Sequence, residues 1–82
     1  MIRVIGYPSS EDRDEGINGI VIDTAGTPET LAEIVRNSEN TILGYADEGG
    51  ALLNLDDAML RLGAAWDSLT EAFYHKGRII KL

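Results

Sequence analysis

The chain of 82 residues contains no cysteine, a single histidine and two prolines. Without cysteine it can form no disulfide, and it has neither a thiolate metal ligand nor a catalytic thiol. It also lacks a long hydrophobic run and a basic amino-terminal segment followed by an apolar one. We therefore expect neither a membrane span nor a secretory signal, no contact with membranes, and a cytoplasmic location.

Basic residues are scarce, with seven Lys and Arg against fourteen Asp and Glu, which gives a net charge of −7. The first sixty positions hold twelve of the acidic residues but only three arginines. A negative field of this kind attracts basic partners and repels nucleic acid and anionic membranes. The expected partner is thus a basic protein, and direct binding of nucleic acid is not expected.

Size and composition predict one small globular domain that spans residues 1–82. Hydrophobic residues make up 44% of the chain and charged residues 26%, which is ordinary for a folded domain. A chain of this length has room for one core and buries a limited fraction of its surface.

The amino-terminal part of the chain predicts two strands joined by a loop. Ile2–Tyr7 is rich in β-branched residues and stops at Pro8, which predicts a strand. Residues 9–16 are polar and acidic, which favours an exposed, mobile loop. Ile20–Ile22 is a continuous apolar run, typical of a strand buried on both faces.

The middle of the chain contains a helix start and two further strands. Thr27 can cap a helix, Pro28 suits its first position, and the pattern fades at Asn37. Thr41–Tyr45 predicts a third strand, and Ala51–Leu53 a short fourth one after a glycine-containing turn.

Apolar residues near the carboxyl terminus recur at helical spacing. The stripe predicts one long helix from Leu55 to Lys76, capped by Asn54 and ended by Gly77. It places Trp66 in the core and treats Gly63 as a point of close packing. Arg78–Leu82 then forms a terminal strand. The residues of the stripe are Leu55, Met59, Leu62, Trp66, Leu69 and Phe73.

The predicted fold class is α+β, with a mixed or antiparallel sheet of about four or five strands covered by two helices. The predicted order of elements is ββαββαβ.

Motifs for catalysis or metal binding are incomplete. Asp23–Gly26 matches the DxxG segment of GTPases, but no phosphate-binding loop accompanies it, so a turn is the favoured interpretation. Asp12 and Asp14 lack the remaining ligands of a calcium loop. His75 has no evident catalytic companion and suits a helix carboxyl end. We predict no enzyme activity, no catalytic residue, no metal and no cofactor.

Residues 65–70, followed by a strand-like Arg78–Leu82, resemble the helix and following strand of barstar-type ribonuclease inhibitors. Those inhibitors are also small and acidic, and such a helix presents carboxylates to a basic nuclease cleft. The resemblance implies that Asp67 and Glu71 serve this role. It covers only part of the chain, and the later helix and strand of that family have no counterpart here.

The acidic surplus has two interpretations. Scattered carboxylates can simply keep a small domain soluble. Alternatively, they gather on neighbouring loops and mimic the phosphates of a nucleic acid, as in nuclease inhibitors or viral anti-defence proteins of the anti-CRISPR type. The predicted partner-binding residues are Glu11, Asp12, Asp14, Glu15, Asp47, Glu48, Asp56 and Asp57.

The leading hypothesis is therefore a non-enzymatic acidic inhibitor that docks on a basic, nucleic-acid-binding protein surface. The alternative is a structural or assembly subunit that forms a homo-oligomer through an apolar surface, with Tyr7, Tyr45 and Tyr74, or through a sheet edge. A small enzyme or metal-dependent module is the third class.

Overall fold

Strand β1 (Ile2–Gly6) lies inside a four-stranded antiparallel sheet of order β2-β1-β3-β4 in the computed structural model, which describes residues 1–39 and 42–82. Its neighbours are β2 (Ile20–Ala25) and β3 (Leu43–Ala46), and β3 also pairs with β4 (Leu52–Leu53). Thr41, where the third strand was predicted to begin, lies outside the described residues. The predicted strands at the start of the chain and before Asn54 are confirmed.

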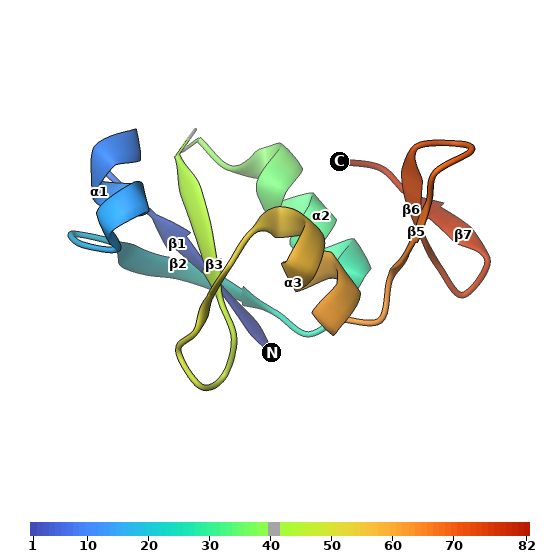
Figure 1. The fold of residues 1–82 in the computed structure, drawn as a ribbon, viewed down its shortest axis with the longest axis horizontal. Coiled ribbons are helices and arrows are strands. Elements are labelled where there is room, and N and C mark those ends of the chain that lie inside the picture. Colours follow the sequence, from blue (N-terminus) through green and yellow to red (C-terminus); the bar gives the residue numbers. More distant parts are fainter. Residues whose placement is uncertain (40–41) are drawn as a thin grey trace.

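Helices α2 (Pro28–Asn37) and α3 (Leu55–Arg61) pack beside this sheet (Figure 1). Both begin where capping chemistry predicts. The Thr27 hydroxyl accepts a hydrogen bond from the Thr30 amide at 3.1 Å, and the Asn54 side chain accepts one from the Asp57 amide at 2.7 Å. The core is apolar throughout and consists of Ile2, Val4, Ala25, Leu31, Ala32, Tyr45, Ala58, Met59, Ala64, Phe73 and Ile80.

The Tyr7 ring lies against two glycines, Gly19 and Gly44. A Cβ atom on Gly44 would lie 2.5 Å from Tyr7 Cε2, and one on Gly19 would lie 2.6 Å from Tyr7 Cε1. The ring therefore contacts bare backbone at both positions, and Tyr7 is buried, with 8% of its surface exposed. Glycine is needed here for close approach.

The acidic segment after β1 is a short helix, α1 (Ser10–Glu15), and the predicted loop is wrong. The Ser9 hydroxyl accepts a hydrogen bond from the Asp12 amide at 3.1 Å, and the helix ends at Gly16. None of its residues is buried. Local capping and acidic residues in the first turn favour a helix even without an apolar stripe.

Strand β2 is exposed, and the prediction of a strand buried on both faces is wrong. It pairs with β1 on one side and forms an edge of the sheet. The exposed fractions of Ile20, Val21 and Ile22 are 71%, 53% and 40%. A run of apolar residues reports β propensity, but it does not show whether other elements cover the strand.

The predicted long helix is also wrong, because α3 ends at Arg61. Gly63 has a φ of +100°, which lies outside the helical region and is accessible to glycine at little cost. Three antiparallel strands follow and form a second sheet of order β5-β6-β7. They are β5 (Ala65–Asp67), β6 (Ala72–His75) and β7 (Arg78–Ile80), and the last confirms the predicted terminal strand in part.

Strand pairing explains why the stripe was misleading. Trp66 pairs with Phe73, and Phe73 pairs with Ile80, so residues seven apart share one face of the second sheet. The same spacing is two turns of a helix. Phe73 and Ile80 are buried, but Trp66 is 51% exposed and contacts Phe73 edge-on at 4.9 Å between ring centroids. The predicted burial of Trp66 is wrong.

The second sheet lies at the opposite end of the molecule from α1 (Figure 1). It is attached to α2 by polar contacts as well as by Phe73 and Ile80. His75 Nδ1 lies 2.7 Å from Glu29 Oε2, and the Arg36 guanidinium donates to the Lys81 carbonyl. The α+β class is thus confirmed, but the described residues form two antiparallel sheets and three helices in the order βαβαββαβββ. Within the described residues, no helix has the length and apolarity to cross a membrane.

Candidate protein-binding surfaces

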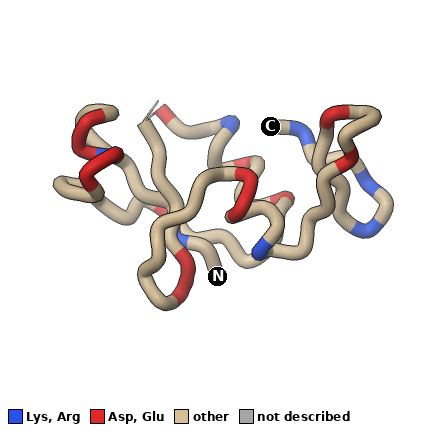
Figure 2. Tube along the Cα trace, in the orientation of Figure 1, with Lys and Arg blue, Asp and Glu red and all other residues tan. Residues whose placement is uncertain are grey.

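The eight predicted partner-binding residues lie on three separate segments (Figure 2). Four are on α1, two are in the turn between β3 and β4, and two are in the first turn of α3. The four on α1 belong to one six-residue helix with a single basic residue, Arg13. The set is Glu11, Asp12, Asp14 and Glu15 on α1, then Asp47 and Glu48, then Asp56 and Asp57.

Asp47 and Glu48 already have partners within the chain. Asp47 pairs with Arg61 at 3.1 Å and accepts the Ala51 amide at 2.9 Å. Hydrogen bonds from backbone amides, with the Arg61 contact, hold the pKa of Asp47 below its ordinary value. The Glu48 carboxylate lies 2.6 Å from the Met1 amine, which lowers the pKa of Glu48. These two carboxylates are therefore less available than those on α1.

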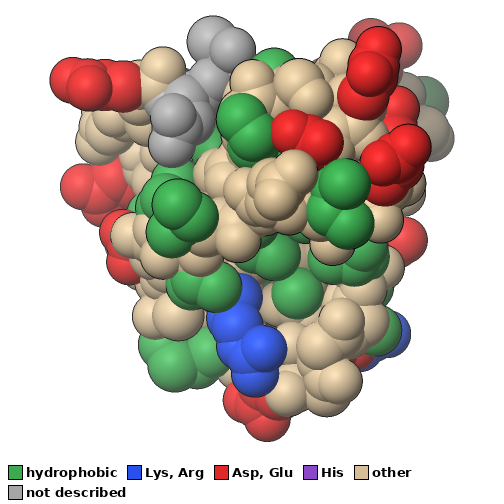
Figure 3. Space-filling view, turned by 90° about the vertical axis from the view of Figure 1, so that its left-hand side faces the viewer, with side chains coloured by type: hydrophobic (Ala, Val, Ile, Leu, Met, Phe, Trp, Pro, Cys, Tyr) green, Lys and Arg blue, Asp and Glu red, His purple; other side chains and the backbone are tan. Residues whose placement is uncertain are grey.

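The carboxylates of α1 are exposed, and most of their charge is uncompensated. Arg13 Nε lies 3.8 Å from Asp14 Oδ1, and both side chains are open to water. Asp12 Oδ1 accepts a hydrogen bond from the Asn18 amide group at 3.4 Å. Figure 3 looks at the end of the molecule that carries α1 and shows hydrophobic side chains between groups of acidic ones. This end combines negative charge with apolar surface.

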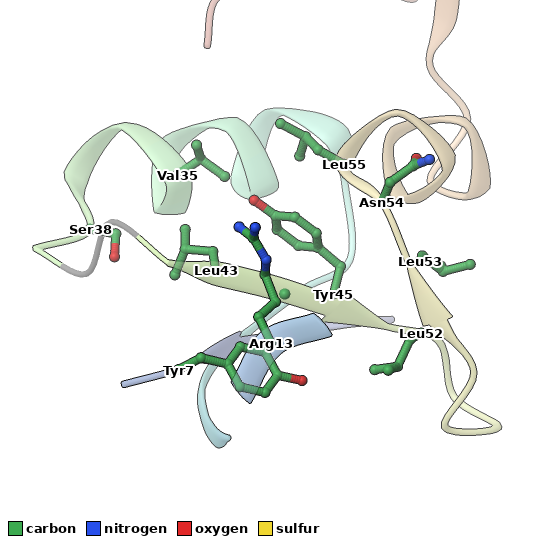
Figure 4. A pocket seen from close by; sticks show the side chains of 11 residues that line it. Tyr7, Arg13, Val35, Ser38, Leu43, Tyr45, Leu52, Leu53, Asn54 and Leu55 are labelled. Atoms are coloured by element: carbon green, nitrogen blue, oxygen red, sulfur yellow. The ribbon is translucent and has the colours of Figure 1, made fainter. Parts of the chain in front are cut away.

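A groove opens where β4 stops short beside β3 (Figure 4). Leu53 pairs with Tyr45, and Asn54 then caps α3, so the Leu43 end of β3 has no partner in β4. The groove has a volume of about 730 Å³. Its lining residues are Tyr7, Arg13, Val35, Ser38, Leu43, Gly44, Tyr45, Leu52, Leu53, Asn54 and Leu55.

Arg13 is the one charged residue that lines this groove among the described residues. Its side chain lies near the Tyr45 ring (Figure 4). Burial raises the pKa of the Tyr45 hydroxyl, and the charge of Arg13 opposes that rise. Carboxylate and imidazole groups are absent from the described lining, so it offers apolar walls and one cation rather than a pair of groups for acid–base chemistry.

A second groove of about 550 Å³ lies between β2 and α2. Ile22 and Ile34 supply apolar walls, and three carboxylates, those of Asp23, Glu33 and Glu39, line it as well. Sequence reasoning missed this site. The sequence feature that could have indicated the groove is the spacing of Thr30, Glu33, Ile34 and Asn37, which places these residues on one face of α2.

The residues nominated by the inhibitor resemblance lie in strands and turns. Asp67 is in β5, where its carboxylate accepts the Leu69 amide at 2.9 Å, and Glu71 has a φ of +52° just before β6. The helix implied by the resemblance does not form, because residues 65–67 pair with residues 72–74 as antiparallel strands, joined by a turn. The resemblance therefore supports neither the fold nor these two residues as a binding site.

The remaining motif residues have structural contacts. The Asp23 carboxylate accepts the Thr24 amide at 2.8 Å. His75 lies in β6 instead of at a helix end, which corrects that prediction, and it pairs with Glu29. Across residues 1–39 and 42–82, the structure contains no group of three or more His, Cys, Asp or Glu placed to hold a metal ion.

No family model, curated protein or solved structure matches the chain.

Proposed function

We propose that this chain is a non-enzymatic inhibitor that docks on a basic, nucleic-acid-binding surface of a partner protein. Its exposed carboxylates take the places of nucleic-acid phosphates. Nuclease inhibitors and viral anti-defence proteins of the anti-CRISPR type act in this way, and such a chain would work in the cytoplasm of the cell that contains its partner.

Helix α1 is the observation that carries the proposal. It has four acidic residues and one basic residue, and it contributes no buried residue to the core. Glu11, Asp14 and Glu15 stand three and four positions apart, so they share one side of the helix, with neighbouring Cβ atoms about 5–6 Å apart. A capped helix holds these carboxylates in fixed positions, which suits recognition of a basic surface.

The decisive experiment compares α1 variants for capture and association. The tagged chain is used to capture proteins from a lysate, and the captured partner is purified. Association is then measured for the parent, for Glu11→Lys/Asp14→Lys/Glu15→Lys, and for the neutral Glu11→Gln/Asp14→Asn/Glu15→Gln. Asp12 is left unchanged because its carboxylate bonds Asn18.

We expect charge reversal to slow association about tenfold or more, the neutral variant to slow it less, and salt at about 0.5 M to remove the difference. The partner's own nucleic acid should compete with the chain. A ternary complex with that nucleic acid, or association unaffected by both reversal and salt, would contradict the proposal.

The alternative, a homo-oligomeric assembly subunit, is favoured by one observation, the apolar edge strand β2. Sedimentation distinguishes the two functions. Because each copy carries a charge of −7, self-association through β2 should strengthen as salt screens the repulsion, whereas docking on a basic partner should weaken.

A further inference from the structure

Strand β2 is an open edge with an apolar surface. It spans six residues and pairs with β1 on one side only. Edge strands are usually protected from further pairing by charged residues, proline or a covering element. Here Ile20, Val21 and Ile22 are all exposed. The strand contains no proline, and its protective features are a bulge at Ile22 and one charged residue, Asp23. The exposed apolar residues of this edge therefore suit it to pairing with an added strand.

The groove between β2 and α2 lies along this same strand. Ile22 and Asp23 line it from β2, and Glu33 and Ile34 line it from α2. A lysine or arginine entering the groove would place its aliphatic stem on the isoleucines and its charged head among the carboxylates. The exposed strand supplies backbone pairing, and the groove supplies charge recognition.

We propose that β2 and this groove bind an extended segment of the partner in which basic residues alternate with apolar ones. Side chains of an added strand alternate between its two faces, so every second one points to the α2 side, and the one beside Ile22 and Asp23 meets the groove. This inference rests on the proposed function, because it takes the partner to be basic.

Charge complementarity favours such a segment over a second copy of the chain. The sequence of β2, Ile-Val-Ile-Asp-Thr-Ala, contains no basic residue. Two β2 strands paired across a dimer would therefore bring Asp23 and the acidic grooves together with no cation from either strand. A basic segment supplies what this surface lacks.

The test uses a short capped peptide of alternating lysine and valine, titrated into the full chain while backbone amide signals are recorded by NMR. We expect shifts along β2 and the adjoining side of α2. Glu33→Lys should weaken binding about tenfold or more, consistent with the loss of one charge-assisted hydrogen bond. N-methylation of the peptide backbone should abolish binding, because it removes the donors needed for strand pairing.

Glu71→Lys is the matched control, because it makes the same change of charge just before β6, at a residue that lines neither the groove nor α1. Equal weakening by Glu33→Lys and Glu71→Lys, or shifts confined to α1, would overturn the inference. So would β2 shifts that depend on protein concentration without peptide, since these would identify a second copy as the occupant. Failure of the peptide to bind would refute this site and leave the α1 experiment as the separate test of the inhibitor function.

Discussion

The molecule has two parts, which differ in how their strands pair. We call β1–β4 with the three helices the body, and β5–β7 the meander. The body joins segments far apart in the chain, such as β1 with β3, around the fully buried Leu31, Met59 and Val4. The meander pairs only strands that follow one another in sequence. It supplies Phe73 and Ile80 to the common core and leaves Trp66 and Ile79 about half exposed.

The comparison shows which interactions fix each part. The body is held by apolar burial, which dominates folding free energy. The meander depends on two buried side chains and on contacts to α2, namely Glu29 with His75 and Arg36 with the Lys81 carbonyl. Exposed ion pairs contribute little. The meander should therefore be the less stable of the two parts.

Truncation of buried side chains gives the largest expected effect. Leu31→Ala should cost about 2–5 kcal/mol and Phe73→Ala about 3–5 kcal/mol of unfolding free energy. Trp66→Ala should cost about 1.5 kcal/mol or less, since half of that side chain is exposed and its main specific contact is with Phe73. Urea unfolding followed by far-UV circular dichroism measures all three.

The fluorescence of Trp66, the single tryptophan, reports on the meander alone. In Phe73→Ala, the fluorescence transition should precede loss of helix signal. Coincident transitions would show that the meander and the body unfold as one unit.

A substitution of Gly63 tests the boundary between the two parts. Its φ of +100° is unfavourable for a side chain, so Gly63→Ala should destabilise the protein by about 1–2 kcal/mol. In a continuous helix the same change would stabilise it by about 1 kcal/mol. The sign of the shift in thermal midpoint therefore decides between the strand and helix interpretations of this segment.

Lowering the pH should weaken the packing of the meander on α2, with a smaller effect on stability than the substitutions above. Burial pushes the pKa of Glu29 upward, but hydrogen bonds and the nearby charges of His75 and Lys76 hold it below its ordinary value. A lowered folded-state pKa gives stability above the unfolded value, which is lost as pH falls through the folded value. As the pH falls below about 4.5, the ordinary carboxyl pKa, Trp66 fluorescence should therefore show the meander separating from α2 before the helix signal is lost.

In Glu29→Gln this part of the pH dependence should disappear, whereas Glu33→Gln, on the same helix but away from His75, should retain it. An identical acid response in both variants would contradict a role for the Glu29–His75 pair.

Local chemistry made part of the fold predictable. The caps at Thr27 and Asn54 correctly placed two helix starts, because a side-chain hydrogen bond to a nearby amide depends on few residues. Apolar spacing failed after Leu62, since residues seven apart align both on a helix and across adjacent hairpin strands. Gly63 was the local sign of the break.

The acidic character of the molecule was predictable, but the distribution of its charges was not. Composition gives the net charge, whereas partners such as Arg61 for Asp47 lie far enough along the chain that only the folded structure identifies them. The groove between β2 and α2 likewise requires knowledge that β2 is an edge strand.

The contact of Tyr7 with Gly19 and Gly44 has a consequence for how freely the sequence can vary. A side chain at Gly44 would meet the Tyr7 ring, and one at Gly19 would meet both Ile5 and the Tyr7 ring, at distances that real atoms do not adopt, so either substitution requires these neighbours to shift. The acidic positions of α1 pack against nothing in the core. In a library of random variants selected only for folding, we therefore expect many substitutions on α1 and almost none at Gly19 and Gly44. Selection for folding alone thus leaves the proposed binding surface free to change.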